Sequence, residues 1–496
     1  MSGGAAMVQT AALHGVETMG VTVEVSTSGG IPGFDIVGMP DSSVLEARSR
    51  VRCALRSCKF ELPREHVTIN LSPADMRKSG TAFDLPIAVA ILIATRQLPP
   101  RIVDGCLLVG ELGLNGNVNV VRGDVAYEAY ACERNLTLIT SVGSPLMGGC
   151  YGDVRGIGSL LDIRGGVDSL VRLGNACREE PEAPYESLDF DDVVDQELAK
   201  RAMVIAAAGR HGMLMVGPPG SGKTMLARRL PTILPPLSEE ERANALLIHS
   251  VAGQPIDAVA RGERPFRAPH HSISIGGLIG GGRPVLPGEI SLAHKGVLFL
   301  DELPEFARNS LQALRQPLED REVRVGRVDG SYTFPCDFQL VGAANPCPCG
   351  HLGDPGHECT CSASRIAAYQ SRIGGPLMDR IDVVVDVARP ETSKVIKGQT
   401  GMSSSEMARL VEDARSFAEE REQGLCNKTK DPIARANLDL RAQAVFEGLA
   451  ERLALGGRAI VRVARVARTI ADLEQRECVS EDNIVEALGF RSRTLG

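Results

Sequence analysis

The stretch Gly217-Pro218-Pro219-Gly220-Ser221-Gly222-Lys223-Thr224 decides the fold of the central part of this 496-residue chain. It follows the apolar run Met213–Val216, which is typical of a buried strand, and it opens the helix-like run Met225–Arg229. A glycine-rich loop in this position lets backbone N–H groups curl around phosphates, and the helix N-terminus adds partial positive charge. We therefore predict that residues 217–224 bind ATP, with Lys223 at the β- and γ-phosphates and Thr224 as a ligand of Mg²⁺.

Two further strand-like runs end in polar residues that suit ATP hydrolysis. Gly296–Leu300 is followed by Asp301 and Glu302. At the tip of a buried strand, Asp301 can hold Mg²⁺ through water and Glu302 can polarise the attacking water. The run Phe338–Ala343 leads to Asn345, whose amide can orient that water. Together the three runs predict an α/β core with a parallel sheet and a hydrolytic nucleotide site.

The composition limits the partners and the compartment. Hydrophobic residues make up 43% and charged residues 23%, as in ordinary globular proteins. The net charge of -8 argues against nucleic acid coating the whole surface, but it leaves open a local basic stripe in a ring or groove. We find no signal-peptide pattern, and the most apolar run, Leu85–Ala94, is too short to span a bilayer. We therefore expect a cytoplasmic protein with no membrane association.

Changes in composition divide the chain into four predicted parts. The first part mixes strand-like runs such as Val67–Leu71 with helix-like runs such as Ser43–Ser57, which predicts an α/β domain. An acidic, proline-containing linker follows, then the ATPase core, then a helical region in which Ser480 is a plausible N-cap. The predicted boundaries are 1–175, 176–190, 191–392 and 393–496.

Longer strings in the ATPase part and the first part resemble one family. They are Arg264-Pro-Phe-Arg-Ala-Pro-His-His-Ser272, Gly288-Glu-Ile-Ser-Leu-Ala-His-Lys295 with Gly296–Phe306, Asn345-Pro-Cys-Pro-Cys-Gly350, Gly375-Pro-Leu-Met-Asp-Arg-Ile-Asp382, Phe34-Asp-Ile-Val-Gly-Met-Pro-Asp41, Asn70-Leu-Ser-Pro-Ala-Asp75 and Phe83-Asp-Leu-Pro-Ile-Ala88. In these strings the chain resembles the ComM family, the magnesium-chelatase-like AAA+ group also called YifB.

The resemblance implies an AAA+ core, a Lon-protease-like (S5-like) N-terminal α/β domain and a C-terminal helical lid domain. It also implies a hexameric ring that works on single-stranded or branched DNA in its pore and drives branch migration of transforming DNA. By position, Asn345 is similar to sensor 1, and Arg380 to the arginine finger that reaches a neighbouring subunit, with Arg372 as the alternative. Arg458 is similar to sensor 2, although Gly456-Gly457 replaces the Ser-Ala that usually precedes it. The alternatives for this role are Arg462, Arg465 and Arg468 on the same predicted helix.

Two segments are candidates for DNA contact. The Gly-rich stretch Arg267–Arg283 resembles the helix-2 insert of the chelatase clade. The stretch Arg321–Pro335 reads as a hairpin around Asp329-Gly330, and it carries Arg321, Arg324 and Arg327. In a ring these arginines would contact phosphates, whereas the alternative is a solvated edge hairpin.

Four cysteines form the exception to an otherwise scattered set of thiols. Cys347, Cys349, Cys359 and Cys361 lie within 15 positions, which is enough for a tetrahedral structural zinc site. The C-x-C spacing is tighter than the usual C-x2-C, and free surface thiols are the alternative. Such a site would fix the loop after Asn345 and perform no chemistry.

We predict that the first domain has no peptidase activity. A Ser–Lys dyad needs a lysine that follows the serine, but after Lys78 the next lysine is Lys200, in the ATPase part. The helix with Arg48, Arg50, Arg52 and Arg56 is a candidate DNA surface, with a solvated face as the alternative. The leading expectation is a DNA motor, and the second is an ATPase that remodels a protein partner, as chelatase motor subunits do.

Overall fold

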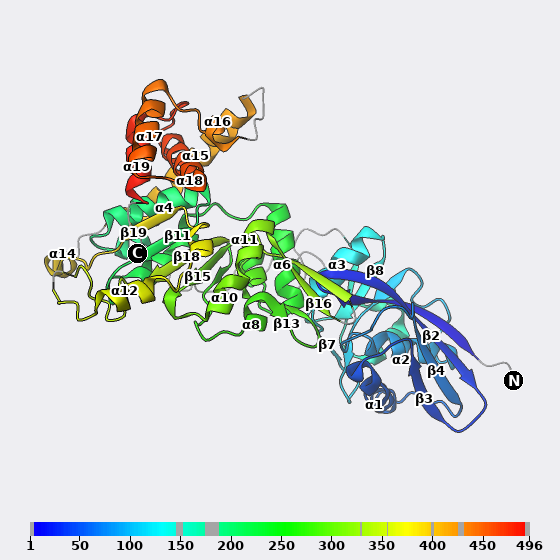
Figure 1. Ribbon diagram of the computed structural model, residues 1–496. Coiled ribbons are helices and arrows are strands. Elements are labelled where there is room, and N and C mark those ends of the chain that lie inside the picture. Colours follow the sequence, from blue (N-terminus) through cyan, green and yellow to red (C-terminus); the bar gives the residue numbers. More distant parts are fainter. Residues whose placement is uncertain are drawn as a thin grey trace.

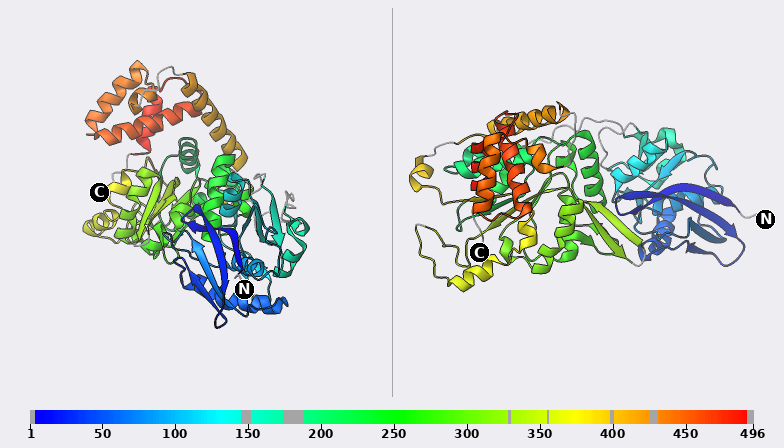
Figure 2. Two further views of the ribbon diagram at one scale, coloured as in Figure 1. Left: turned by 90° about the vertical axis from the view of Figure 1, so that its right-hand side faces the viewer. Right: turned by 45° about the horizontal axis from the view of Figure 1, so that its top comes forward.

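Three regions follow one another along the chain (Figure 1). The computed structural model describes residues 4–144, 152–173, 188–327, 330–354, 356–397, 401–424 and 431–491. The N-terminal region and the C-terminal helices lie at different ends of the ATPase region, and the views in Figure 2 agree on this arrangement. Most of the predicted linker, residues 176–187, lies outside the described residues, while Phe190 at its end is buried in the ATPase core.

The N-terminal region is a mixed sheet with helices packed on it. Among the described residues its eight strands have the order β10-β9-β8-β5-β1-β2-β4-β3. The strands are β1 Ala5–His14, β2 Glu17–Ser28, β3 Gly33–Val37, β4 His66–Ser72, β5 Cys106–Leu108, β8 Thr137–Ser141, β9 Val154–Ile157 and β10 Val171–Arg172. The helices are α1 Ser42–Ser57, α2 Asp84–Ala94 and α3 Asp124–Glu133. The predicted α/β character is therefore confirmed.

Helix α2 explains the most apolar run of the sequence. Every residue of α2 is buried, because the helix packs on β1 and β2 with one side and on α1 with another. Arg50 of α1 does not join an arginine surface, since its Nε donates to the buried Asp84 Oδ2 at 2.6 Å. The candidate DNA surface on α1 is therefore reduced to Arg48, Arg52 and Arg56, which are exposed.

The ATPase region is built on a parallel sheet of five strands, counted in the described residues. Their order is β12-β15-β18-β11-β19, and every neighbouring pair is parallel. The strands are β11 Met213–Val216, β12 Phe266–Arg267, β15 Val297–Leu300, β18 Gln339–Ala344 and β19 Val383–Asp386. Because β11, β15 and β18 are buried along their whole length, they read as unbroken apolar runs. This sheet confirms the predicted parallel core.

The C-terminal region is helical in its described residues. It comprises α15 Ser404–Gly424, α16 Pro432–Ala436, α17 Leu440–Arg452, α18 Gly457–Leu473 and α19 Glu481–Gly489. Ser480 caps α19 in a capping box with Asn483, as the sequence predicts. Helices α15 and α18 pack on α4 (Glu197–Gly209) of the ATPase region. In the described part of the chain, no helix is both long and apolar enough to cross a membrane.

Among the described residues, two contacts join the N-terminal region to the ATPase region. Gly123 N and Val125 N, at the start of α3, donate to Ser250 O and Ser250 Oγ of α6 (Glu239–Ala252) at 3.1 and 3.2 Å. Val125 also belongs to an apolar cluster that includes Leu246 of α6.

The second contact is made by the hairpin of β16 (Glu322–Arg327) and β17 (Gly330–Pro335). Tyr332 of β17 stacks on His14 at the end of β1, with ring centroids 4.2 Å apart. The predicted hairpin is confirmed, although Val328 and Asp329 at its tip lie outside the described residues.

Candidate functional site

The glycines of the phosphate loop permit its backbone path. Gly220 and Gly222 have φ values of 76° and 93°, in the left-handed region that favours glycine. A β-carbon on Gly217 would lie 2.1 Å from the carbonyl oxygen of Val387, which follows β19. Gly217 N donates to Ala344 O at the end of β18 (3.1 Å), so the loop leaves the sheet between its two neighbouring strands.

Lys223 lies buried at the centre of this loop. Its Nζ donates to the carbonyl oxygens of Gly217 (2.7 Å) and Pro218 (2.9 Å), and to Asn345 Oδ1 (3.3 Å). Burial lowers the pKa of Lys223 below its usual range. Within the described residues, Ser221 Oγ is buried without a hydrogen-bond partner. A buried ammonium held by neutral oxygens, beside an orphaned hydroxyl, fits the phosphates of ATP.

Thr224 and Asp301 fit a magnesium site. Thr224 Oγ1 donates to Asp301 Oδ2 at 2.7 Å, although 77 positions separate the two residues. Thr224 lies in the first turn of α5 (Lys223–Arg229), and Asp301 directly follows β15. Both oxygens are hard donors of the kind that Mg²⁺ prefers. The two residues would hold the ion between the phosphate loop and the tip of β15.

Glu302 stands beside this pair in an uncommon backbone conformation. Its φ is 50°, and its N–H donates to Asp301 Oδ1 (2.9 Å). Its side chain is 56% exposed, so it can reach a water molecule next to bound phosphates. His271 Nδ1 lies 3.6 Å from Glu302 Oε2, and this contact was not predicted. His271 lies in the family-like stretch Arg264–Ser272, but the distance along the chain between His271 and Glu302 does not indicate that the two side chains are in contact.

Asn345 completes the cluster at this edge of the sheet. It directly follows β18, and its side chain contacts Lys223. The structure thus brings together five predicted residues from three strand ends: Lys223, Thr224, Asp301, Glu302 and Asn345. Their individual roles in hydrolysis stay predictions.

Arg380 and Arg458 do not join this cluster. Arg380 precedes β19, and the neighbouring Asp382 N and Val383 N donate to Gly212 O, which precedes β11. Arg458 Nη1 donates to Asp379 Oδ2 at 2.9 Å. Both arginines therefore lie at the edge where the strands begin, whereas the phosphate loop lies where they end. Strands of four residues separate the edges by about 13 Å.

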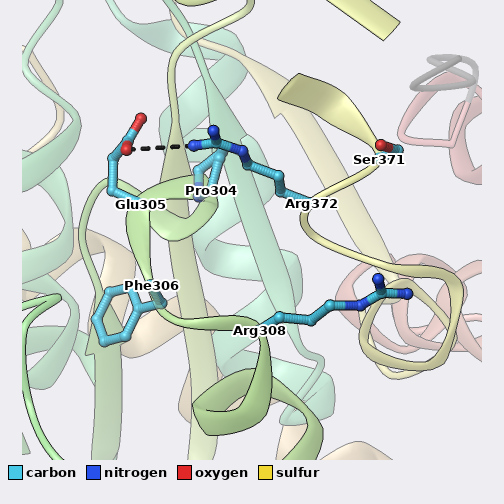
Figure 3. A pocket seen from close by; sticks show the side chains of 6 residues that line it. All are labelled: Pro304, Glu305, Phe306, Arg308, Ser371 and Arg372. Carbon is cyan, nitrogen blue, oxygen red and sulfur yellow. Dashed lines mark hydrogen bonds and ion pairs between the residues drawn. The ribbon is translucent and has the colours of Figure 1, made fainter. Parts of the chain in front are cut away.

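Arg372, the alternative arginine, lies near the tip of β15. Its Nη1 is 3.5 Å from Glu305 Oε2. Figure 3 shows this pair and Arg308 beside a cavity. The cavity has a volume of about 410 Å³ and is lined by Pro304, Glu305, Phe306, Arg308, Ser371 and Arg372. Arg380 instead forms an ion pair with Glu319. The two candidate arginine fingers therefore have different carboxylate partners.

The four clustered cysteines converge after β18. Sγ of Cys347 lies 3.4 Å from Sγ of Cys349 and 3.6 Å from Sγ of Cys359. Cys349 and Cys359 are 3.7 Å apart, and all four sulfur atoms lie within 4.8 Å of one another. Sulfur atoms bound to one zinc ion at about 2.3 Å in a tetrahedron stand about 3.8 Å apart.

The protonation of one of these thiols, that of Cys349, suits a metal, whereas the pKa values of Cys359 and Cys361 are raised. Backbone N–H groups of His351 and Thr360 lower the pKa of the Cys349 thiol to about 5. A thiol that ionises this easily supplies the thiolate that metals bind. His351, Asp354 and His357 form a second group within 4.8 Å, and they lie beside the cysteines in sequence.

The parallel sheet, phosphate loop and acidic strand tip define a P-loop ATPase of the AAA+ type. The family model described as "Magnesium chelatase, subunit ChlI" matches residues 189–395. The model "Subunit ChlI of Mg-chelatase" matches 23–140, and "Magnesium chelatase, subunit ChlI C-terminal" matches 401–491.

Relatives of similar length narrow this class. The chain is 38% identical to the competence protein ComM of Haemophilus influenzae over 98% of this chain and 97% of that protein. It is 38% identical to YifB of Escherichia coli over the same shares. The "Magnesium-chelatase 67 kDa subunit" of Chlorobaculum parvum is 30% identical over 32% of this chain and 23% of that protein. The chain belongs to the ComM/YifB family of magnesium-chelatase-like proteins, as its sequence predicts.

Proposed function

We propose that this chain is an ATP-driven, ring-forming DNA motor that promotes branch migration when transforming DNA recombines with the chromosome. The observation that carries the proposal is the likeness to the competence protein ComM over nearly the whole of both chains. Recombination of transforming DNA with the chromosome requires strand exchange, and a motor that moves a branch point serves that step. We propose that the protein works in the cytoplasm.

The division of the ATPase site between two edges supports a ring. Arg380 and Arg458 are remote from the phosphate loop of their own chain, so each can meet nucleotide only on a neighbouring subunit. A cation supplied in this way stabilises charge on the transferring phosphoryl group and links hydrolysis between neighbours. We propose a hexamer in which Arg380 is the arginine finger and Arg458 is sensor 2.

Within one subunit, the residues at the other edge hold and orient the reactants. Lys223, the loop amides and Ser221 would hold the phosphates, and Thr224 and Asp301 would hold Mg²⁺. Bound Mg²⁺ supplies charge neutralisation at the phosphates. Glu302 takes a proton from the attacking water, and Asn345 orients that water. His271 limits the positions that the Glu302 carboxylate can adopt.

We propose that the hairpin β16–β17 contacts DNA phosphates. The side chains of Arg321 and Arg324 are 72% and 68% exposed, and their present partners are Asp337 and Glu322. The Arg324–Glu322 pair is solvent-accessible, and such pairs contribute only about 0–1 kcal/mol, so a phosphate can replace this carboxylate. The contact of Arg321 with Asp337 is long, at 3.7 Å, so Arg321 can also turn to a phosphate. Contacts to phosphates do not depend on sequence, which suits a translocating motor.

The N-terminal region is proposed to be a Lon-like domain without peptidase activity. Lys78 is buried, and its Nζ donates to the carbonyl oxygens of Pro73 and Met76. It is therefore unavailable as a general base. We also propose that the four clustered cysteines hold a structural Zn²⁺.

DNA-dependent ATP hydrolysis tests the motor proposal. We expect single-stranded or branched DNA to raise the steady-state ATPase rate of the purified protein, and Arg324→Ala with Arg321→Ala to reduce that stimulation. Arg101→Ala is the matched control, because Arg101 is an exposed arginine in the N-terminal region that lies outside α1 and the hairpin. A rate that DNA does not change would contradict the proposal.

The second candidate function is remodelling of a protein partner. It is favoured by the likeness of 161 residues to a magnesium-chelatase subunit. It predicts a stoichiometric protein partner and an ATPase rate that DNA leaves unchanged.

A further inference from the structure

The cysteine loop, residues 346–361, packs against the phosphate loop. It begins directly after Asn345, whose side chain contacts Lys223. A β-carbon on Gly350 would lie 2.6 Å from Cδ and 2.8 Å from Cγ of Pro219. Gly350 is buried and has a φ of 84°. The cysteine loop is therefore a wall of the nucleotide site.

A second contact joins the cysteine loop to the other side of the phosphate loop. Arg389 Nη2 lies 3.4 Å from Asp354 Oδ2. Two positions before Arg389, Val387 N donates to Val216 O (2.8 Å), and the carbonyl of Val387 faces Gly217. The phosphate loop is thus held between Gly350 on one side and the chain that carries Arg389 on the other.

Among its described residues, two side-chain groups fix the cysteine loop: the four thiols, and the Asp354 carboxylate, which contacts His351, His357 and Arg389. Its described residues, 346–354 and 356–361, form no helix or strand between β18 and α12 (Ala363–Gln370). Cys347 is buried, and Gln370 Nε2 donates to Pro346 O (3.0 Å), so both ends of the loop are anchored. The four sulfur atoms join the beginning of the loop, Cys347 and Cys349, to its end, Cys359 and Cys361, and their separations match a tetrathiolate metal site. In small loops of this kind, metal binding supplies the free energy of folding.

We propose that a metal ion bound by Cys347, Cys349, Cys359 and Cys361 fixes the cysteine loop against Pro219, so that ATP affinity depends on occupancy of this metal site. The inference rests on the zinc site proposed above and extends it from a structural role to control of nucleotide binding. Loss of the metal frees Gly350 from Pro219 and Asn345 from Lys223. The phosphate loop then loses part of the preorganisation that favours phosphate binding.

Metal content and nucleotide affinity, both measured on the full chain, test this inference. We expect inductively coupled plasma mass spectrometry of the purified protein to find about one zinc ion per chain. The double variant Cys349→Ser/Cys359→Ser is expected to lose the ion and to bind a fluorescent ATP analogue about tenfold more weakly. Cys478→Ser, at an exposed thiol elsewhere, is the control and should change neither quantity. Far-ultraviolet circular dichroism reports whether each variant is folded.

Gly350→Ala tests the contact with Pro219 separately from metal binding. The four ligands are intact in this variant, so it should retain zinc, while its methyl group displaces Pro219 and weakens nucleotide binding. Zinc-free wild-type protein would overturn the metal site. Zinc-bound Gly350→Ala with wild-type affinity, or folded zinc-free protein with wild-type affinity, would overturn the coupling. Neither assay contains DNA, so failure of the motor proposal is recognised separately, by the DNA-dependent ATPase assay.

Discussion

Asp124, at the start of α3, carries a quantitative prediction about the junction between the N-terminal and ATPase regions. Its side chain is buried, Thr140 Oγ1 donates to its Oδ1 (3.3 Å), and its Oδ2 has no partner among the described residues. Burial raises the pKa of Asp124 to about 7, against hydrogen bonds that lower it. Since the neighbouring Gly123 and Val125 contact Ser250, the charge on Asp124 affects the docked end of α3.

The direction in which stability changes with pH follows from the pKa of Asp124, which is higher in the folded state than the unfolded value of about 3.8. The folded state binds the proton more tightly, so stability is greatest below pH 3.8 and falls as the pH rises to about 7. Relative to a side chain that is always neutral, ionisation destabilises the region by about 2 kcal/mol at pH 5 and about 4 kcal/mol at pH 8. Asp124→Asn removes this dependence.

The measurement compares urea unfolding of the wild type and Asp124→Asn at both pH values, followed by circular dichroism. The difference in free energy of unfolding should favour the variant by about 2–3 kcal/mol more at pH 8 than at pH 5. Any packing effect of the amide is the same at both pH values and cancels. Asp104→Asn, at an exposed aspartate, should show no such change. An equal difference at both pH values for Asp124→Asn would refute the reasoning.

Two further predictions concern the ATPase site. Arg380→Ala should lower kcat about 10²–10³-fold while ATP binding persists, and mixing it with Lys223→Ala should restore activity, because mixed rings contain interfaces with an intact phosphate loop and an intact arginine. Mixtures no more active than either variant alone would contradict a shared site. His271→Ala should change kcat more than KM, since it frees the Glu302 carboxylate without touching the phosphate loop, and His271→Gln should partly restore the rate. Unchanged kcat in His271→Ala would contradict a positioning role.

The sequence predicts the part of the site that lies at strand ends. Asp301 and Asn345 each follow a buried apolar run, and parallel strands bring their carboxyl ends to one edge. This rule places them near Lys223 without knowledge of the loops. The sequence also predicts the C-terminal helices, because the N-cap Ser480 and the apolar spacing of α18 are local signals.

Contacts made by long insertions could not be predicted in the same way. The contact of His271 with Glu302 depends on the path of the chain between β12 and α8 (Ile275–Ile279). The contact of Gly350 with Pro219 depends on the closure of an irregular loop. Arg50 reads as one of four surface arginines, but it turns inward to Asp84, since a buried carboxylate needs a partner. None of these pairings follows from spacing or periodicity.

Movement of a four-way DNA junction is the measurement that tests the central claim most directly. Wild-type protein with ATP should convert a labelled mobile junction into duplex products. Glu302→Gln should bind ATP and form rings, but it should hydrolyse ATP about 10²–10⁴-fold more slowly and leave the junction in place. An active wild-type ATPase that does not move the junction, or a Glu302→Gln variant that moves it at the wild-type rate, would contradict the proposed DNA motor.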